Sequence, residues 1–215
     1  MTLTTSNVLP TATRRTAWLW SELAVLYALY PAAVVVGAME VDDRWVVWGF
    51  TSAYIAIVLF ARRPTRQSLG VPKLSPLARV ALSGLVLLGL LVLSSYAGKV
   101  TGPGEARRLV LVFGVYPVVS VPAQEFYFRS FFFMRYRELL KPLPLAGVNA
   151  MTFSFYHALF GGWMSIIASL AGGAVLSLLY VRFRNVLVCA VVHFLLGLLA
   201  YFSGNAHLFT RLKLF

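Results

Sequence analysis

Long apolar runs alternate with short polar segments along almost the whole chain. Seven such runs can be distinguished, at residues 18–39, 45–61, 80–97, 109–134, 145–160, 163–180 and 186–203. A helix needs about 20 residues to cross the hydrocarbon core of a bilayer, and most of these runs approach that length. The pattern therefore predicts an all-α fold, a polytopic transmembrane helix bundle with about seven spans, within a range of six to eight.

The fourth apolar run differs from the others because it contains two prolines, Pro117 and Pro122. Proline removes a backbone donor and clashes with the preceding turn, so a helix usually kinks or restarts there. We therefore expect this run to be interrupted rather than regular.

The distribution of basic residues between the runs predicts the orientation. With seven spans, the loops on the side of the N-terminus contain twelve Lys and Arg residues, and the loops on the other side contain six. Cytoplasmic loops carry an excess of Lys and Arg. The bias predicts a cytoplasmic N-terminus, and we expect an integral membrane protein of the bacterial inner membrane.

The composition supports a membrane protein and argues against a nucleic-acid partner. Of 215 residues, 60% are hydrophobic and 12% are charged, and the mean hydropathy is +0.79, whereas soluble domains contain about 25% charged residues. The net charge of +12 comes from basic residues in short loops between apolar runs, which is a membrane pattern. We expect membrane lipids as partners and no nucleic acid. The single cysteine, Cys189, excludes an internal disulfide.

Four ionisable residues interrupt the apolar runs: Glu125, Arg129, His157 and His193. Such groups are costly at membrane depth and usually face a protein interior or a wet cavity. Counted from the predicted cytoplasmic ends at 1.5 Å per residue, Glu125, His157 and His193 lie roughly 13, 18 and 10 Å deep. Three helices therefore bring these side chains to a similar level, which predicts one polar site.

Within the fourth run, Glu125 and Arg129 are four residues apart and share a helix face, so they can pair. Gln124 lies 100° around the helix from Glu125 and can point into the same cavity. Taken alone, the pair of Glu125 and Arg129 is equally consistent with a contact that only stabilises the helix, and each histidine with an ordinary core residue. The matched depth of the three segments favours a functional site.

The chemistry of this residue set leaves several functions open. Two histidines and a glutamate can bind Zn²⁺ with an open fourth position. They can equally hold and deprotonate a water without a metal, because a buried carboxylate beside a histidine suits general-base work. Either arrangement leads to hydrolysis, and we expect no cofactor, with zinc as the alternative. A proton relay or a small transporter uses the same residue types.

The order and spacing of these residues resemble the CPBP family of intramembrane proteases, also called the Abi family, which includes the type II CAAX prenyl proteases. Its hallmarks are Glu-Glu-x-x-x-Arg, Phe-x-x-x-His and His-x-x-x-Asn/Asp on successive membrane helices. The matching segments are Gln124-Glu125-x-x-x-Arg129, Phe153-x-x-x-His157 and His193-x-x-x-Gly197. The resemblance implies cleavage of a peptide bond near the cytoplasmic face by glutamate-activated water, although many members are labelled metalloproteases.

Two positions depart from the family pattern. Gln124 replaces the glutamate that activates water in the family, and an amide is not a base. Gly197 replaces the asparagine that helps to stabilise the oxyanion. Three alternatives follow: Glu125 acts as the base, the roles are shifted in a divergent branch, or the protein binds without cutting.

We therefore predict an intramembrane endopeptidase that acts on a membrane-associated or lipidated peptide or protein. Its catalytic residues would be Glu125, His157 and His193, with Gln124 and Arg129 in support and no metal. The alternatives are a non-catalytic membrane binding or immunity protein, or a small transporter. The predicted organisation is a mobile cytoplasmic tail (1–16), N-terminal membrane helices (17–108), CPBP-like catalytic core helices (109–204) and a C-terminal tail (205–215).

Overall fold

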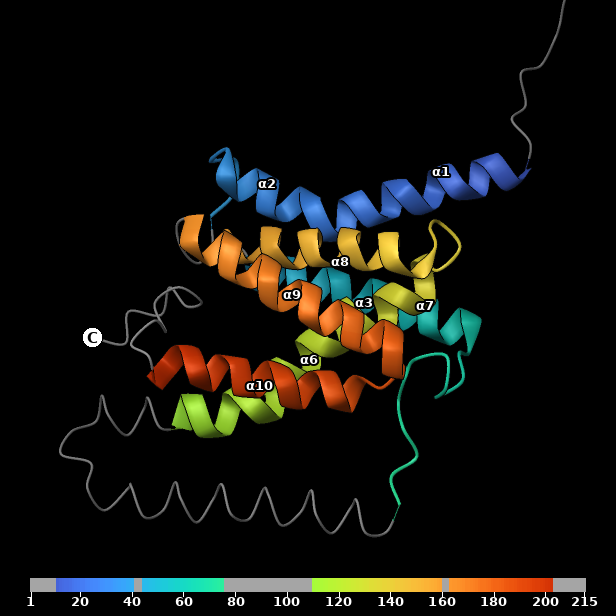
Figure 1. Ribbon diagram of the computed structural model, residues 1–215. Coiled ribbons are helices and arrows are strands. Elements are labelled where there is room, and N and C mark those ends of the chain that lie inside the picture. The colour runs from blue at the N-terminus through green and yellow to red at the C-terminus, as the bar shows by residue number, and fades with distance from the viewer. Residues whose placement is uncertain (1–10, 41–43, 76–109, 160–162, 203–215) are drawn as a thin grey trace, which may run out of the picture.

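The computed structural model describes residues 11–40, 44–75, 110–159 and 163–202. Within these ranges all regular secondary structure is helical, which confirms the predicted fold class. Figure 1 shows the helices running side by side. They are α1 (Thr11–Ala24), η1 (Val25–Leu29), α2 (Tyr30–Val35), α3 (Arg44–Arg62), η3 (Val110–Ser120), α6 (Val121–Glu125), η4 (Phe126–Phe131), α7 (Phe132–Tyr136), α8 (Pro142–His157), α9 (Trp163–Phe183) and α10 (Val186–Phe202). The predicted run 80–97 lies outside the described residues.

The first helix begins earlier than its apolar run predicts. Helix α1 starts at Thr11, inside the segment 1–16 that the sequence predicts as a tail. Residues 11–17 contain no Gly or Pro that would stop a helix. Arg15 also anchors this turn, because its Nη2 donates a hydrogen bond of 2.9 Å to Oε1 of Glu138 beyond α7.

The outer surface of the bundle is apolar, as a membrane protein requires. Two helical segments, Ala12–Val35 and Trp163–Phe183, are long and apolar enough to cross a bilayer, and Val46–Arg62 and Val186–Ala200 are shorter apolar helices. Large apolar side chains point outward, among them Phe50, Phe60 and Phe202, which are 71–77% exposed. Soluble monomers rarely expose so much apolar surface, whereas lipid accepts it. The fold is a helical membrane bundle, and the number of about seven spans stays a prediction.

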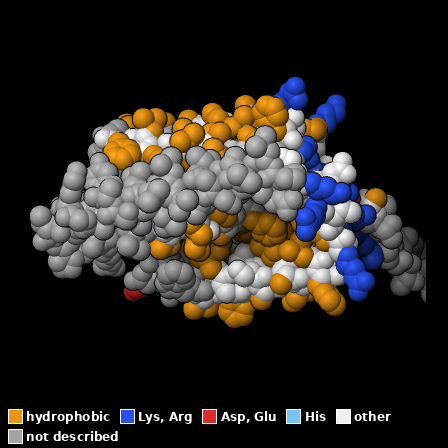
Figure 2. Space-filling model, turned by 90° about the horizontal axis from the view of Figure 1, so that it is seen from below, with side chains coloured by type: hydrophobic (Ala, Val, Ile, Leu, Met, Phe, Trp, Pro, Cys, Tyr) orange, Lys and Arg blue, Asp and Glu red, His pale blue; other side chains and the backbone are white. Residues whose placement is uncertain are grey.

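Basic side chains mark one end of this bundle. Figure 2 shows Lys and Arg gathered at one end of the face in view, with apolar side chains along the length. Helix α1 begins at this end, and α3 ends there. The segment after α3 packs against the connection between α9 and α10, because the amide of Val186 donates to the carbonyl oxygen of Gly70 at 2.8 Å. This is the end that the sequence predicts to be cytoplasmic.

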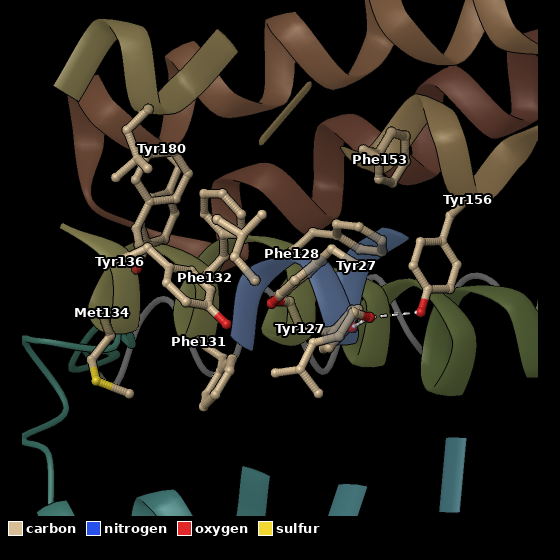
Figure 3. Packing of buried hydrophobic residues seen from close by; sticks show 14 of the residues in the cluster. Tyr27, Tyr127, Phe128, Phe131, Phe132, Met134, Tyr136, Phe153, Tyr156 and Tyr180 are labelled. Atoms are coloured by element: carbon tan, nitrogen blue, oxygen red, sulfur yellow. Dashed lines mark hydrogen bonds between the residues drawn. The ribbon is translucent and has the colours of Figure 1, made fainter. Parts of the chain in front are cut away.

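A π-helical turn in the first helix creates an acceptor for two tyrosines. In η1 the hydrogen-bond pattern widens from i→i+4 to i→i+5. The carbonyl oxygen of Leu26 in this turn accepts hydrogen bonds from the hydroxyls of Tyr127 and Tyr156. The hydroxyl of Tyr27 donates in return to the carbonyl oxygen of Tyr127 at 2.8 Å. Figure 3 shows these side chains within the aromatic core that joins η1 to η4 and α8.

A buried ion pair also fixes the first helix to α7. Nε of Arg135 donates to Oε1 of Glu22 at 2.7 Å, and Nη2 donates to Oε2 at 2.5 Å. The hydroxyl of Tyr136 adds a third hydrogen bond to Oε1 of Glu22, at 3.1 Å. Glu22 and Arg135 are only 6% and 7% exposed. The carboxylate is therefore held by three donors inside the bundle.

Helices α8 and α9 approach closely because small residues face each other. A Cβ added to Gly173 would lie 3.0 Å from Cδ1 of Phe153 and 3.3 Å from the carbonyl oxygen of Ala150. Asn149 of α8 connects three elements: its Nδ2 donates to the carbonyl oxygen of Phe128 at 2.6 Å, and its Oδ1 accepts from the hydroxyl of Ser177 at 2.8 Å. This network holds η4, α8 and α9 together, and among these elements η4 carries Arg129 and α8 carries His157.

Candidate functional site

The centre of the candidate site is the carboxylate of Glu125, the last residue of α6. Its side chain is fully buried. Nδ1 of His193, from α10, donates a hydrogen bond of 2.7 Å to Oε1 of Glu125. A carboxylate accepts hydrogen bonds, so the proton is assigned to Nδ1 of the ring. Two residues 68 positions apart in the sequence therefore meet in space.

The second oxygen of Glu125 faces Arg129, one turn further along the same helix. Nε of Arg129 lies 3.4 Å from Oε2 of Glu125, and both side chains are fully buried. This contact is an ion pair without hydrogen-bond geometry. Among the described residues, neither Oε2 of Glu125 nor any guanidinium nitrogen of Arg129 has a hydrogen-bond partner. The pair is therefore electrostatically coupled but incompletely hydrogen-bonded.

The ring of Phe153 brings the remaining groups together. The guanidinium carbon of Arg129 lies 4.8 Å from the centre of this ring, a cation–π contact. The imidazole of His157, one turn later on α8, packs against the same ring at 4.4 Å between ring centres. The imidazole of His193 meets it edge-on at 5.6 Å. One phenyl ring thus contacts the arginine and both histidines.

The hydrogen bond of His157 to its own helix assigns the positions of its protons. Nδ1 lies 2.9 Å from the carbonyl oxygen of Phe153, which can only accept. Nδ1 therefore carries a hydrogen, and in the neutral ring Nε2 carries the lone pair. His157 and His193 each keep 8% of their surface exposed, whereas Glu125 keeps none. Both histidines are therefore also buried, although less completely than Glu125.

The predicted supporting residue Gln124 is directed elsewhere. Its side chain is partly exposed, and its Nε2 donates a hydrogen bond of 2.9 Å to the hydroxyl of Ser120, one turn earlier on the same helix. The structure brings together Glu125, Arg129, His157 and His193, but it gives the Gln124 amide a local partner.

Tyr116 of η3 is a neighbour of the site that sequence reasoning missed. Its ring lies edge-on to His193, with 6.1 Å between the ring centres. Its hydroxyl lies against Gly197, where a Cβ would overlap it. On a regular α-helix, the nine residues from Tyr116 to Glu125 amount to about two and a half turns, which would place the two on opposite faces. The π-helical winding of residues 110–120 changes this phase, so the sequence held no clear signal.

The described residues include no group of three or more His, Cys, Asp or Glu side chains arranged to hold a metal ion. Glu125 and His193 are in direct contact, while Nδ1 of His157 turns toward the backbone of its own helix.

A comparison with protein families assigns the region that carries these residues. The family model for type II CAAX prenyl endopeptidases, described as Rce1-like, matches residues 106–199. This region is similar to the Rce1-like family. The resemblance to CPBP proteases that the sequence motifs suggest is therefore confirmed at the level of the family. No curated protein and no solved structure matches the chain.

The Rce1-like region contains the whole constellation described above. It includes η3, α6, η4, α7, α8 and α9 and most of α10, whereas α1 to α3 precede it. The family supports a membrane endopeptidase of the CAAX-protease type, acting on membrane-associated proteins.

Proposed function

We propose that this protein is an intramembrane endopeptidase that cleaves a peptide bond of a membrane-associated or lipidated substrate. The observation that carries the proposal is the contact between Glu125 and His193, 2.7 Å long, with His157 packed on the same phenyl ring. These residues come from three helices of the Rce1-like region. A buried carboxylate and two imidazoles supply the groups that hydrolysis of an amide requires.

In the proposed mechanism Glu125 and His157 hold the attacking water. Oε2 of Glu125 accepts no hydrogen bond from the described residues, so it can accept one from the water. Nε2 of His157 takes the proton as the water oxygen bonds to the substrate carbonyl carbon, and later returns it to the leaving amine. The basis for this role is the tautomer of His157, with its hydrogen on Nδ1.

His193 is proposed to stabilise the negative charge that develops on the carbonyl oxygen. Because its Nδ1 donates to Glu125, the ring offers Nε2–H to an oxyanion when it is protonated. The carboxylate of Glu125 accepts the Nδ1 hydrogen and so holds the ring in this orientation, as a carboxylate does in other catalytic dyads. Arg129 is proposed to hold the carboxylate in place through the ion pair and its contact with Phe153.

The test is a cleavage assay in proteoliposomes with a fluorogenic, farnesylated peptide that ends in a Cys-aliphatic-aliphatic-X sequence. Wild type is compared with Glu125→Gln, His157→Ala and His193→Ala, each with and without a chelator. Loss of cleavage in all three variants, with wild-type activity indifferent to the chelator, supports the metal-free scheme. Loss with the chelator that zinc restores would make these residues metal ligands instead.

A second candidate function is binding without cleavage. It is favoured by the amide at Gln124, which bonds to Ser120, and by the absence of a side chain at Gly197. In this case the wild type would bind the lipidated reporter in a fluorescence-anisotropy assay but leave it intact. Cleavage by the wild type rules this candidate out.

The cytoplasmic position of the basic end is also a proposal, supported by the gathering of Lys and Arg there. Gln67 lies in the exposed segment after α3. Gln67→Cys in a Cys189→Ala background should react with a membrane-impermeant maleimide only after the cells are opened. Labelling of intact cells would reverse the orientation.

A further inference from the structure

The contact between Tyr116 and Gly197 places a phenol beside the candidate site. Gly197 lies one helical turn after His193 on α10, and residues four apart share a helix face. The hydroxyl of Tyr116 occupies the space that a side chain at position 197 would enter. The ring of Tyr116 meets the His193 imidazole edge-on, 6.1 Å between ring centres. Tyrosine and imidazole therefore lie on the same side of α10.

The hydroxyl of Tyr116 differs from those of the core tyrosines in its hydrogen bonding. It makes no hydrogen bond to another residue within the described ranges, and the side chain is only partly buried. The buried tyrosines of the core behave differently, because Tyr27, Tyr127 and Tyr156 all donate to backbone carbonyls. Buried phenols normally find a partner. The Tyr116 hydroxyl therefore lies against Gly197, one helical turn from His193, as a donor without a partner among the described residues.

We propose that the Tyr116 hydroxyl is a second donor to the substrate oxyanion, acting beside His193. This inference rests on the proposed peptidase function and names a further catalytic residue for it. The phenol O–H donates to the carbonyl oxygen as it gains charge, and no proton needs to be transferred. Gly197 has a role in this arrangement, because only a residue without a Cβ leaves room for the hydroxyl.

The decisive variant is Tyr116→Phe, which removes the donor and keeps the ring. Loss of one oxyanion donor typically lowers kcat by about 10²–10³. We expect that loss in kcat for the lipidated reporter, with KM and the melting temperature close to those of the wild type. Tyr54→Phe is the matched control, because Tyr54 is a partly buried tyrosine on α3, outside the Rce1-like region. It should leave kcat unchanged.

A swap tests whether Tyr116 and position 197 share one space. Gly197→Asn alone should reduce activity, because the new side chain overlaps the phenol. The double variant with Tyr116→Ala and Gly197→Asn opens that space and supplies an amide donor. It should cleave at least about tenfold faster than Tyr116→Ala alone, because one oxyanion donor contributes about 10²–10³ in kcat and the new amide should restore part of that. A double variant no faster than Tyr116→Ala contradicts the shared space.

The outcomes separate this inference from the proposed function. If the wild type cleaves and Tyr116→Phe retains full kcat, the hydroxyl is not an oxyanion donor and the peptidase proposal stands. If the wild type cleaves no reporter, the peptidase proposal fails, and the role of Tyr116 fails with it. A loss in Tyr116→Phe that appears only in KM would make Tyr116 a substrate-binding residue and overturn its catalytic role.

Discussion

Two buried pairs of arginine and glutamate in this protein are built in opposite ways. In the pair that joins α1 to α7, Glu22 accepts two hydrogen bonds from Arg135 and a third from Tyr136. In the pair at the end of α6, Glu125 and Arg129 meet through one contact of 3.4 Å, without a hydrogen bond between them. Both pairs are removed from solvent, but only the first is fully satisfied.

The difference separates a structural role from a chemical one. A buried ion pair offsets its desolvation cost only when good geometry and further hydrogen bonds satisfy both partners. The Glu22 pair meets that condition. The Glu125 pair does not, and its carboxylate bonds instead to a histidine. Buried polar groups with incomplete hydrogen bonding are expected mainly at functional sites. We therefore assign the first pair to stability and the second to the candidate chemistry.

The largest effect is expected for Arg129→Ala, which should damage both stability and activity. Removing one partner of a buried pair costs about 3–5 kcal/mol, because the other charge stays buried. Here the charge left behind is that of Glu125. Thermal unfolding in detergent and the cleavage assay should both show the loss. Normal folded yield with normal kcat would contradict the assigned position of Arg129.

Glu125→Gln should separate activity from stability. The amide has nearly the same shape, but it has no negative charge and offers only one oxygen as an acceptor, so it cannot hold both His193 and the attacking water as the carboxylate does. We expect cleavage to fall by about 10²–10⁴, the usual range for a group in acid–base chemistry. The melting temperature should fall less than in Arg129→Ala, because the amide oxygen can still accept the hydrogen bond from His193. The matched variant Glu22→Gln should show the reverse. Equal specific activities for the two variants would erase the distinction between the pairs.

Arg135→Ala tests the structural pair from its other side. The buried charge of Glu22 loses two of its three donors, so the folded state should lose about 3–5 kcal/mol. Activity per folded molecule should stay at the wild-type level. The measurement is kcat normalised by the monodisperse fraction on size-exclusion chromatography, and a fall in that normalised value would link this pair to the site.

The smallest effect is expected for Tyr136→Phe, which removes the third donor to Glu22. Hydrogen bonds to charged groups contribute about 1.5–3 kcal/mol, and two better donors remain, so we expect the lower end of that range. The measurement is the decrease in melting temperature, which should be clearly smaller for Tyr136→Phe than for Arg135→Ala. A shift as large as that of Arg135→Ala would mean that the hydroxyl, and not the guanidinium, supports the carboxylate.

Much of the helical layout follows from local sequence, because lipid-facing helices need long apolar runs. The run 45–61 predicts α3 to within one residue at each end, and the run 163–180 predicts the start of α9. The spacing of Glu125 and Arg129 predicts their shared face, since it depends only on helix geometry. The start of α1 at Thr11 was missed, because an ion pair with Glu138 stabilises a polar turn there.

Contacts between distant segments were harder to predict. Glu22 is the one acidic residue in the run 18–39, so the argument that singled out Glu125 would also have marked it. Its partner Arg135, 113 residues away, has no local signal. Tyr116 was missed because its position depends on π-helical winding, which apolar periodicity does not show. The sequence therefore does not reveal which face each helix turns toward its neighbours.

The carbonyl of Leu26 has a consequence for how far the family region can stand alone. This single oxygen lies before residue 106, yet it accepts the hydroxyls of Tyr127 and Tyr156 inside the Rce1-like region. A protein truncated before residue 106 would also lose Glu22, and with it the partner of Arg135. Excision would thus leave two phenols and a guanidinium without acceptors in an apolar interior. The stretch that resembles other proteases is not a self-sufficient unit, and it depends on a helix that the resemblance does not include.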